Sequence, residues 1–241
     1  TSCMEADPGH YADGMGSEVQ RDCVPGHYQP DSGQASCIEA EAGHSAEGPA
    51  ATSQTICPPG TYQPEAGRAT CIEATGGAFV SEEGSLDFEY CEVGTYQPST
   101  GESECIEAEA GYIVSLIGSL NQYPCEAGTY QPSTGQTECI SAEKGHYVDG
   151  EGSSSQTPCE AGTYQQLAQA TYCVVAGANH FVPEPGAFFQ QPCPSGETQP
   201  EKGQTSCIAE ATGDSGGSVP GFAFMTALVA ISMAARVSRR S

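Results

Sequence analysis

The chain contains no tryptophan and few aromatic or basic residues. Aromatic side chains make up 7% of its 241 residues, and 7 Lys and Arg stand against 31 Asp and Glu, a formal net charge of −24. So few large apolar side chains argue against one large packed core of the kind found in most globular enzymes. Nucleic-acid binding needs basic patches, so the charge balance argues against nucleic acid as a partner.

Cysteine and glycine are abundant instead, with 13 Cys and 30 Gly. The cysteines are separated by a longer and a shorter gap, which alternate without exception from Cys3 to Cys207. The sequence therefore has a constant repeat period, which equals the distance along the sequence from Cys23 to Cys57. Such a regular period indicates a repeat architecture.

A shorter period lies inside this one. Residues 142–147 repeat the pattern of residues 125–130, with alanine in place of cysteine. We therefore divide residues 6–209 into twelve units of 17 residues, which begin at 6, 23, 40 and so on to 193. Two consecutive units, one with cysteines and one without, make up one full period.

Each unit carries glycines at fixed positions. The fourth position is Gly in eleven of twelve units, Asn179 being the exception, and the eleventh position is Gly in ten. The sixth position is Tyr or Phe in nine units. The first Gly predicts a turn with positive φ and the second marks a hairpin tip. Each unit is thus predicted to be a short irregular β-hairpin, and stacked units form an elongated ladder in which each contacts mainly its neighbours.

The repeat also indicates which cysteines pair. Closure across the shorter gap or the longer gap is worth about the same, roughly 3 kcal/mol. In alternate units, however, the first and fifteenth positions lose cysteine together, as in Ala40 with Gln54. Paired loss indicates one disulfide within each cysteine unit. The predicted pairs are Cys23–Cys37, Cys57–Cys71, Cys91–Cys105, Cys125–Cys139, Cys159–Cys173 and Cys193–Cys207. The partner of Cys3 would precede residue 1, so we expect the sequence to be a piece of a longer protein.

The pattern Cys-x-x-Gly-x-Tyr, a second Gly and then Cys, as in residues 57–71 and 125–139, resembles the ephrin-receptor-like, growth-factor-receptor-type cysteine-rich repeat. The resemblance covers about residues 1–209 and implies a small disulfide-rich fold that is mostly irregular and β. This chain departs from the family by omitting the cysteine pair from every second unit, which implies looser structure there. Related modules in the tumour-necrosis-factor receptors bind protein ligands, although fold alone does not fix function.

The chain changes character after the repeats, which we assign to residues 1–211. Residues 212–221 form a linker of mostly small residues, 222–235 are uncharged and mostly apolar, and 236–241 are basic. We predict that 222–235 form a helix that enters a membrane, although a full span needs about 20 residues. Residues 1–218 hold 31 acids and 4 bases, a net charge of −27, and the remaining residues carry +3. The positive-inside rule then places the tail in the cytoplasm and the repeats outside the cell.

The beginning of the apolar segment carries a further signal. Pro220, Gly221 and Phe222, the apolar segment and the terminal arginines resemble the archaeal PGF-type C-terminal sorting tag. The resemblance implies that a sortase-type processing enzyme, an archaeosortase, removes the tag and that the protein becomes attached to a membrane lipid. The alternative is a permanent single-pass anchor.

Three other patterns resemble catalytic or metal-binding motifs, but their sequence context does not support such a role. Residues 213–217, Gly-Asp-Ser-Gly-Gly, match the nucleophile motif of chymotrypsin-like proteases, but nothing upstream indicates the β-barrel that the motif requires. The five His all occupy the fifth position of a unit and are spread along the chain, and no Cys-x-x-Cys zinc motif occurs. Acids that follow the closing cysteines could bind Ca²⁺ weakly, but a solvated charged face is favoured. We predict no enzyme activity, cofactor or metal.

The function predicted from the sequence is that of a non-enzymatic cell-surface protein. Its extracellular repeats would serve as a stalk for spacing, coat formation or adhesion, tethered at the C-terminus. The alternative is a receptor-like module that binds a protein or glycan. The two stretches that deviate most from the repeat are 79–93, with Phe79 and Phe88, and 174–192. For that role the candidate contacts are Phe181, Phe188 and Phe189, in the second of them.

Overall fold

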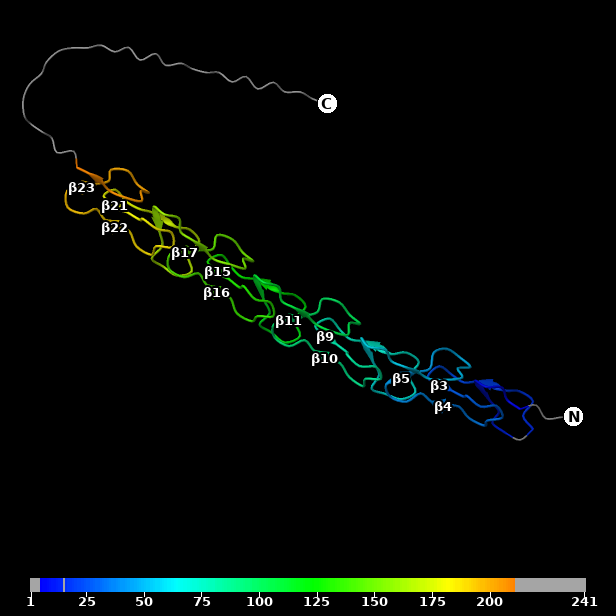
Figure 1. The fold of residues 1–241 in the computed structure, drawn as a ribbon. Coiled ribbons are helices and arrows are strands. Elements are labelled where there is room, and N and C mark those ends of the chain that lie inside the picture. Colours follow the sequence, from blue (N-terminus) through cyan, green and yellow to red (C-terminus); the bar gives the residue numbers. More distant parts are fainter. Residues whose placement is uncertain (1–4, 15, 211–241) are drawn as a thin grey trace, which may run out of the picture. The chain divides into compact units, whose positions relative to one another are not determined.

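The computed structural model describes residues 5–14 and 16–210, and within them every regular element is a short strand. The fifth and sixth residues of each unit pair antiparallel with its last two, giving twelve separate two-stranded hairpins (Figure 1). The pairs are β1 (His10–Tyr11) with β2 (Arg21–Asp22), β3 (His27–Tyr28) with β4 (Ile38–Glu39), β5 (His44–Ser45) with β6 (Thr55–Ile56), β7 (Thr61–Tyr62) with β8 (Ile72–Glu73), β9 (Ala78–Phe79) with β10 (Glu89–Tyr90), β11 (Thr95–Tyr96) with β12 (Ile106–Glu107), β13 (Tyr112–Ile113) with β14 (Tyr123–Pro124), β15 (Thr129–Tyr130) with β16 (Ile140–Ser141), β17 (His146–Tyr147) with β18 (Thr157–Pro158), β19 (Thr163–Tyr164) with β20 (Val174–Val175), β21 (His180–Phe181) with β22 (Gln191–Pro192), and β23 (Glu197–Thr198) with β24 (Ile208–Ala209). The prediction of a disulfide-rich, mostly irregular and β fold is confirmed.

Six disulfides close alternate hairpins. They join the pairs that the paired loss of cysteine in alternate units predicts. Each has a sequence separation of 14 and a Cα–Cα distance of 5.7 Å. Most of the opening cysteines, such as Cys57, are completely buried. Cys3 and the predicted C-terminal helix, residues 222–235, lie outside the described residues.

The core is a narrow column contributed by two positions of each unit. The first position, Cys or Ala, is fully buried in most units. The seventh is Gln in the cysteine units and is usually Val or Ala in the others. The buried seventh-position residues are Gln29, Ala46, Gln63, Val80, Gln97, Val114, Gln131, Val148, Gln165, Val182 and Gln199. Because each unit contributes so little apolar surface, disulfides and backbone hydrogen bonds substitute for a larger core.

The buried glutamines stabilise the turns of their own units. In the unit 57–73, the Gln63 Nε2 donates to the carbonyl oxygen of Thr70 at 2.8 Å, and its Oε1 accepts from the backbone N–H of Glu65 at 3.2 Å. The same two bonds recur in all six cysteine units. A buried amide whose groups are bonded in this way avoids the cost of an unpaired polar group.

Five of the six units without a disulfide are closed by a glutamine instead. In the unit 40–56, Gln54 occupies the position of the second cysteine, and its Oε1 accepts from the backbone N–H of Glu41 at 2.7 Å. Its Nε2 also donates to the Glu41 carboxylate at 3.2 Å. Gln20, Gln122, Gln156 and Gln190 make the same backbone bond. The expectation of looser alternate units is therefore not supported by their hydrogen bonds, since five of six are closed by this glutamine clip.

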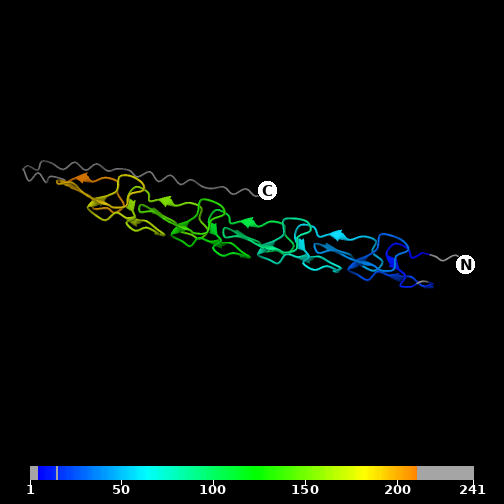
Figure 2. The same cartoon turned by 90° about the horizontal axis from the view of Figure 1, so that it is seen from below.

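Successive units are joined by the same four backbone hydrogen bonds at every described junction. Between the units 57–73 and 74–90, Gly60 N donates to Val80 O at 2.8 Å and Gln63 N to Ser85 O at 3.0 Å. In the other direction, Gly84 N donates to Cys57 O at 2.8 Å and Ala74 N to Gly60 O at 2.9 Å. The repeats form one elongated array, which Figures 1 and 2 show from two sides.

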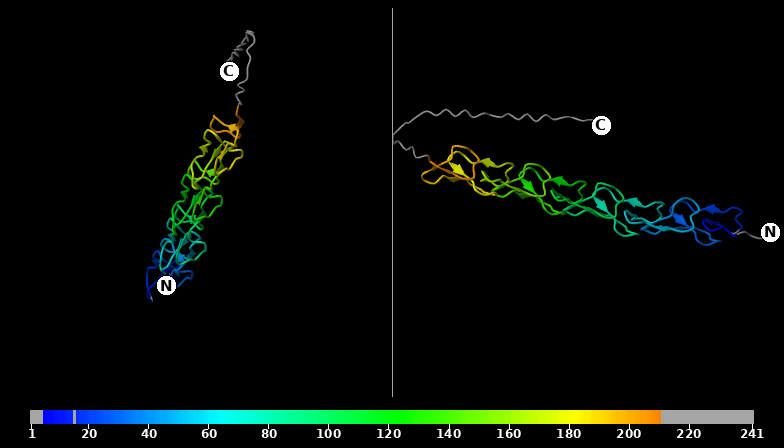
Figure 3. Two further views of the ribbon diagram at one scale, coloured as in Figure 1. Left: turned by 90° about the vertical axis from the view of Figure 1, so that its left-hand side faces the viewer. Right: turned by 45° about the horizontal axis from the view of Figure 1, so that its top comes forward.

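Units also contact the unit that lies two positions later in the chain. The sequence predicts contacts mainly between adjacent units, so these contacts are additional. The fourth-position Gly of one unit packs against the eleventh-position carbonyl two units later, as Gly60 does against Gly101 and Gly94 against Gly135. Alternate units are therefore stacked on one another along the array (Figure 3). No side chain fits at this contact, so glycine is required there for packing as well as for φ.

Positive φ at the two glycine positions confirms the predicted turns. The fourth-position glycines have φ between 79° and 91°, and three non-glycine residues share the conformation: Ala50 at 58°, Gln169 at 60° and Asn179 at 59°. These three are the residues that replace glycine at the two positions. The backbone of the repeat is thus kept where its glycine is lost, at the cost of local strain.

Candidate functional site

The histidines and carboxylates of the described residues form no metal-binding cluster. Residues 5–14 and 16–210 hold no cluster of three or more His, Cys, Asp or Glu arranged to bind a metal ion. The predicted histidines stay on separate hairpins. In β1, the ring of His10 lies between two oxygens, with Nδ1 3.0 Å from Pro8 O and Nε2 3.2 Å from a carboxylate oxygen of Asp22. The Gly-Asp-Ser-Gly-Gly motif at 213–217 is outside the described residues.

The predicted membrane and sorting signals also fall outside the described part of the chain. Pro220, Gly221, Phe222 and the apolar residues up to 235 belong to the range that is not described. Among residues that are described, no helix is long and apolar enough to cross a bilayer.

The predicted aromatic contacts are only partly brought together. Phe188 and Phe189 are 52% and 49% exposed, and their rings meet edge to face with centroids 4.9 Å apart. With Pro183 and Pro185 they line a hollow of about 430 Å³. Phe181 lies in β21 opposite Gln191, is half-buried and does not line the hollow.

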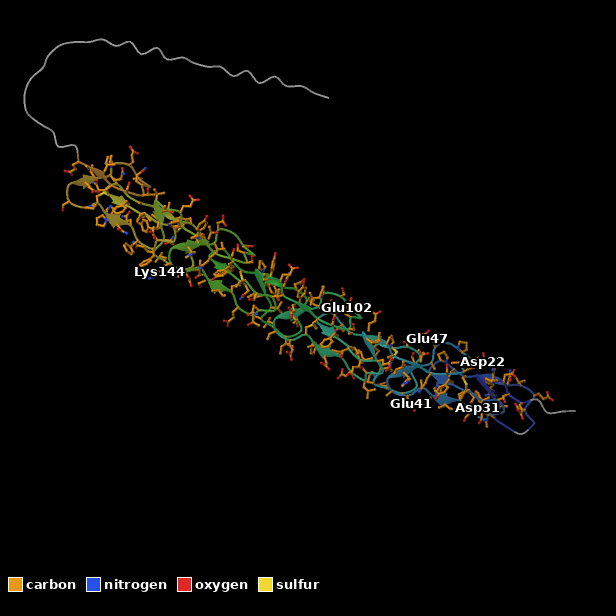
Figure 4. All side chains as sticks on the ribbon, in the orientation of Figure 1. Asp22, Asp31, Glu41, Glu47, Glu102 and Lys144 are labelled. Atoms are coloured by element: carbon orange, nitrogen blue, oxygen red, sulfur yellow. A yellow bond between two sulfur atoms is a disulfide. The ribbon has the colours of Figure 1, made fainter. Side chains whose placement is uncertain are left out.

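This aromatic pair lies in the least charged part of the array. Between residues 161 and 196, Glu184 is the single charged residue. Elsewhere, carboxylate side chains project along the length of the array, among them Asp22, Glu47 and Glu102 (Figure 4). Glu184 lines the hollow beside the pair, so a partner that approaches here would have to desolvate or repel few ionised groups.

The structure shows a second apolar surface, of which sequence reasoning found only the part in the deviant stretch 79–93. Leu116 and Ile117 occupy the hairpin tip of the unit 108–124 and are 69% and 68% exposed. The next residue, Gly118, lies against the ring of Tyr90. Phe88 in turn meets Tyr90 and Tyr62 edge to face, with centroid distances of 5.1 and 5.6 Å. We call Tyr62, Phe88, Tyr90, Leu116 and Ile117 the apolar strip.

Two signals in the sequence could have revealed the apolar strip. Residues 115–118 read Ser-Leu-Ile-Gly where the corresponding tips at 98–101 and 132–135 read Pro-Ser-Thr-Gly. Phe88 stands where the other units have Cys or Gln. Joining these two signals requires knowing that the units 74–90 and 108–124 are in contact, which no local pattern shows.

Comparison with known proteins adds no family to these observations. No protein-family model matches the chain, and no curated protein matches it.

Proposed function

We propose that the protein is a non-enzymatic cell-surface protein whose repeat array is an extracellular stalk. Its role would be spacing, coat formation or adhesion. The observation that carries this proposal is the repeated junction, in which the same four backbone hydrogen bonds join each described unit to the next. A junction that repeats the same hydrogen bonds at every step gives a regular array, which suits a spacer. Six disulfides favour an oxidising compartment such as the cell exterior.

The units are proposed to be of the ephrin-receptor-like, growth-factor-receptor type. Their cysteine spacing and glycine-aromatic pattern, as in residues 57–71, support this assignment. The glutamine clip would then be a variation in which a hydrogen-bonded side chain replaces the disulfide in five of the six alternate units.

The tether is proposed to be the C-terminal segment. The apolar residues 222–235 and the arginines that follow them support a membrane location with the basic tail in the cytoplasm. The tripeptide 220–222 supports removal of this segment by a sortase-type enzyme, and a permanent single-pass anchor is the alternative.

Protease treatment of intact cells tests the proposed location. We expect added protease to remove the repeats from intact cells while a cytoplasmic marker survives, and repeats that are cleaved only after cell lysis would contradict the proposal. Mass spectrometry of the mature C-terminus then separates the two tethers. Loss of the arginine-rich end supports processing, and an intact end supports a permanent anchor.

The exposed pair Phe188 and Phe189 favours a second candidate function, that of a receptor-like module for a protein or glycan. The pair is uncharged, half exposed and set beside a hollow. Replacing both with Ser should abolish binding of the chain to cells or to a captured ligand, while Val19→Ser, an exposed residue on the unit 6–22, should leave that binding unchanged. Unchanged binding by the double variant would contradict this candidate.

A further inference from the structure

The apolar strip crosses three units near the middle of the array. Its residues belong to the units 57–73, 74–90 and 108–124, and its rings and tip are in contact through Phe88, Tyr90 and Gly118. Tyr90 is 57% exposed, and both tip residues are exposed by more than two thirds. Connected large apolar side chains left open to water on a soluble surface mark sites of interaction.

The hairpin tip does not need these side chains for its own structure. At the corresponding tips Thr100 and Thr134 donate hydrogen bonds to Glu73 and Glu107, at 3.0 and 2.9 Å. Ile117 and Tyr90 occupy the equivalent positions, so an apolar pair replaces a hydroxyl–carboxylate hydrogen bond. The tip glycines have nearly the same φ, 73° at Gly101 and 70° at Gly118. The turn therefore forms with either set.

The charges beside the apolar strip indicate what it contacts. Residues 74–107 contain eight Asp and Glu and no Lys or Arg. Asp87 and Glu89, which flank Phe88, are both exposed. A second copy of this chain would bring the same carboxylates against them, and like charges at an interface are unfavourable. A partner that carries cations around an apolar face is complementary in both respects.

We propose that the apolar strip is a docking surface for a cationic, amphipathic segment of another protein. Its apolar side chains cover Tyr90, Leu116 and Ile117, and its Lys or Arg side chains pair with carboxylates such as Asp87 and Glu89. This surface does not depend on the proposed tether or on the Phe188–Phe189 pair.

The test uses the oxidised full chain in a mild nonionic detergent and a labelled synthetic helix of about 18 residues with Leu on one face and Lys on the other. Fluorescence anisotropy at physiological salt should show saturable binding with a stoichiometry of one. Leu116→Ser combined with Ile117→Thr leaves the charge unchanged and should weaken binding about tenfold or more, because two apolar contacts are lost. Asp87→Asn with Glu89→Gln should weaken binding and reduce its dependence on salt.

Matched controls separate this surface from attraction to an acidic protein in general. The double variant Phe188→Ser, Phe189→Ser should bind the peptide like the original chain, and a peptide with Gln in place of Lys should bind weakly. Equal binding by the Leu116 and Ile117 variant, or an equal loss in the Phe188 and Phe189 variant, would overturn the proposal. So would sedimentation data showing that the chain dimerises and that the Leu116 and Ile117 variant does not. Because both tip residues are exposed, thermal unfolding should be unchanged in that variant.

Discussion

Gly60 packs directly against the backbone carbonyl of Gly101, two units later in the array. A Cβ at Gly60 would collide with that oxygen, and its φ of +87° is strained for any other residue. Glycine is thus favoured at position 60 both by the close contact with the carbonyl and by the positive φ. The two can be separated experimentally, because Gly196 has a φ of +85° and no described atom within 4 Å of its Cβ position.

Gly60→Ala should therefore destabilise the array more than Gly196→Ala. We expect the control to lose about 1 kcal/mol from backbone strain alone. Gly60→Ala should lose about 3 kcal/mol or more, because a backbone clash between stacked units is added. Thermal unfolding followed by circular dichroism compares the two, and equal losses would show that the contact between Gly60 and Gly101 is unimportant.

Ala50→Gly should stabilise the protein. Ala50 has a φ of 58°, which glycine adopts without strain, so we expect a gain of about 0.5–1 kcal/mol in the free energy of unfolding. Ala66 lies at a comparable tip without positive φ, and Ala66→Gly should be neutral or destabilising. Chemical unfolding curves for both variants test this, and a loss of stability in Ala50→Gly would count against the strain argument.

The glutamine clip should be convertible into a disulfide. Ala40 and Gln54 occupy the two positions that hold cysteine in the neighbouring units, where the Cα atoms are 5.7 Å apart. The double variant Ala40→Cys, Gln54→Cys should form a seventh bridge and gain roughly 3 kcal/mol, less the contribution of the lost glutamine bonds. Peptide mapping without reduction would show the new bridge. The single variant Ala40→Cys is the control and should keep a free thiol, whereas two free thiols in the double variant would refute the equivalence of the two closures.

The buried turn glutamine should contribute more than an exposed one. Gln63→Ala removes two hydrogen bonds and leaves the Thr70 carbonyl and the Glu65 N–H without their partner, so we expect a loss of about 2–3 kcal/mol. Gln136 is exposed and donates a single bond to Thr134 O at 3.0 Å, so Gln136→Ala should cost less than about 0.5 kcal/mol. Hydrogen exchange of the turn amides would locate the effect, and similar losses in both variants would contradict it.

The spacing of cysteine and glycine predicts the hairpins well because both residues impose local geometry. A disulfide fixes the separation of its two ends, and glycine supplies positive φ. The glutamine clip was missed because Gln54 shares no chemistry with the cysteine it replaces, although it occupies the same position. Phe181 was grouped with Phe188 and Phe189 by closeness in sequence, whereas β21 holds it half-buried beside Gln191.

The connection between the two parts of the apolar strip was not predictable from local patterns. Tyr90 and Ile117 are brought near each other only because a unit packs against the next unit but one. Contacts of that kind cannot be recognised from the pattern of residues within a single unit.

The stacking of alternate units has a consequence for how the array can change in length. Because Gly60 also packs against Gly101, two units later, the units with a disulfide succeed one another in one series and the units without one in a second. If a single unit were removed, the later units with a disulfide would continue the series of units without one, and the reverse. The surface residues of all later units would then lie in the other series. Gain or loss of two units at a time preserves the pattern, so the length of this protein is free to vary in steps of one full period, the stretch from Cys23 to Cys57.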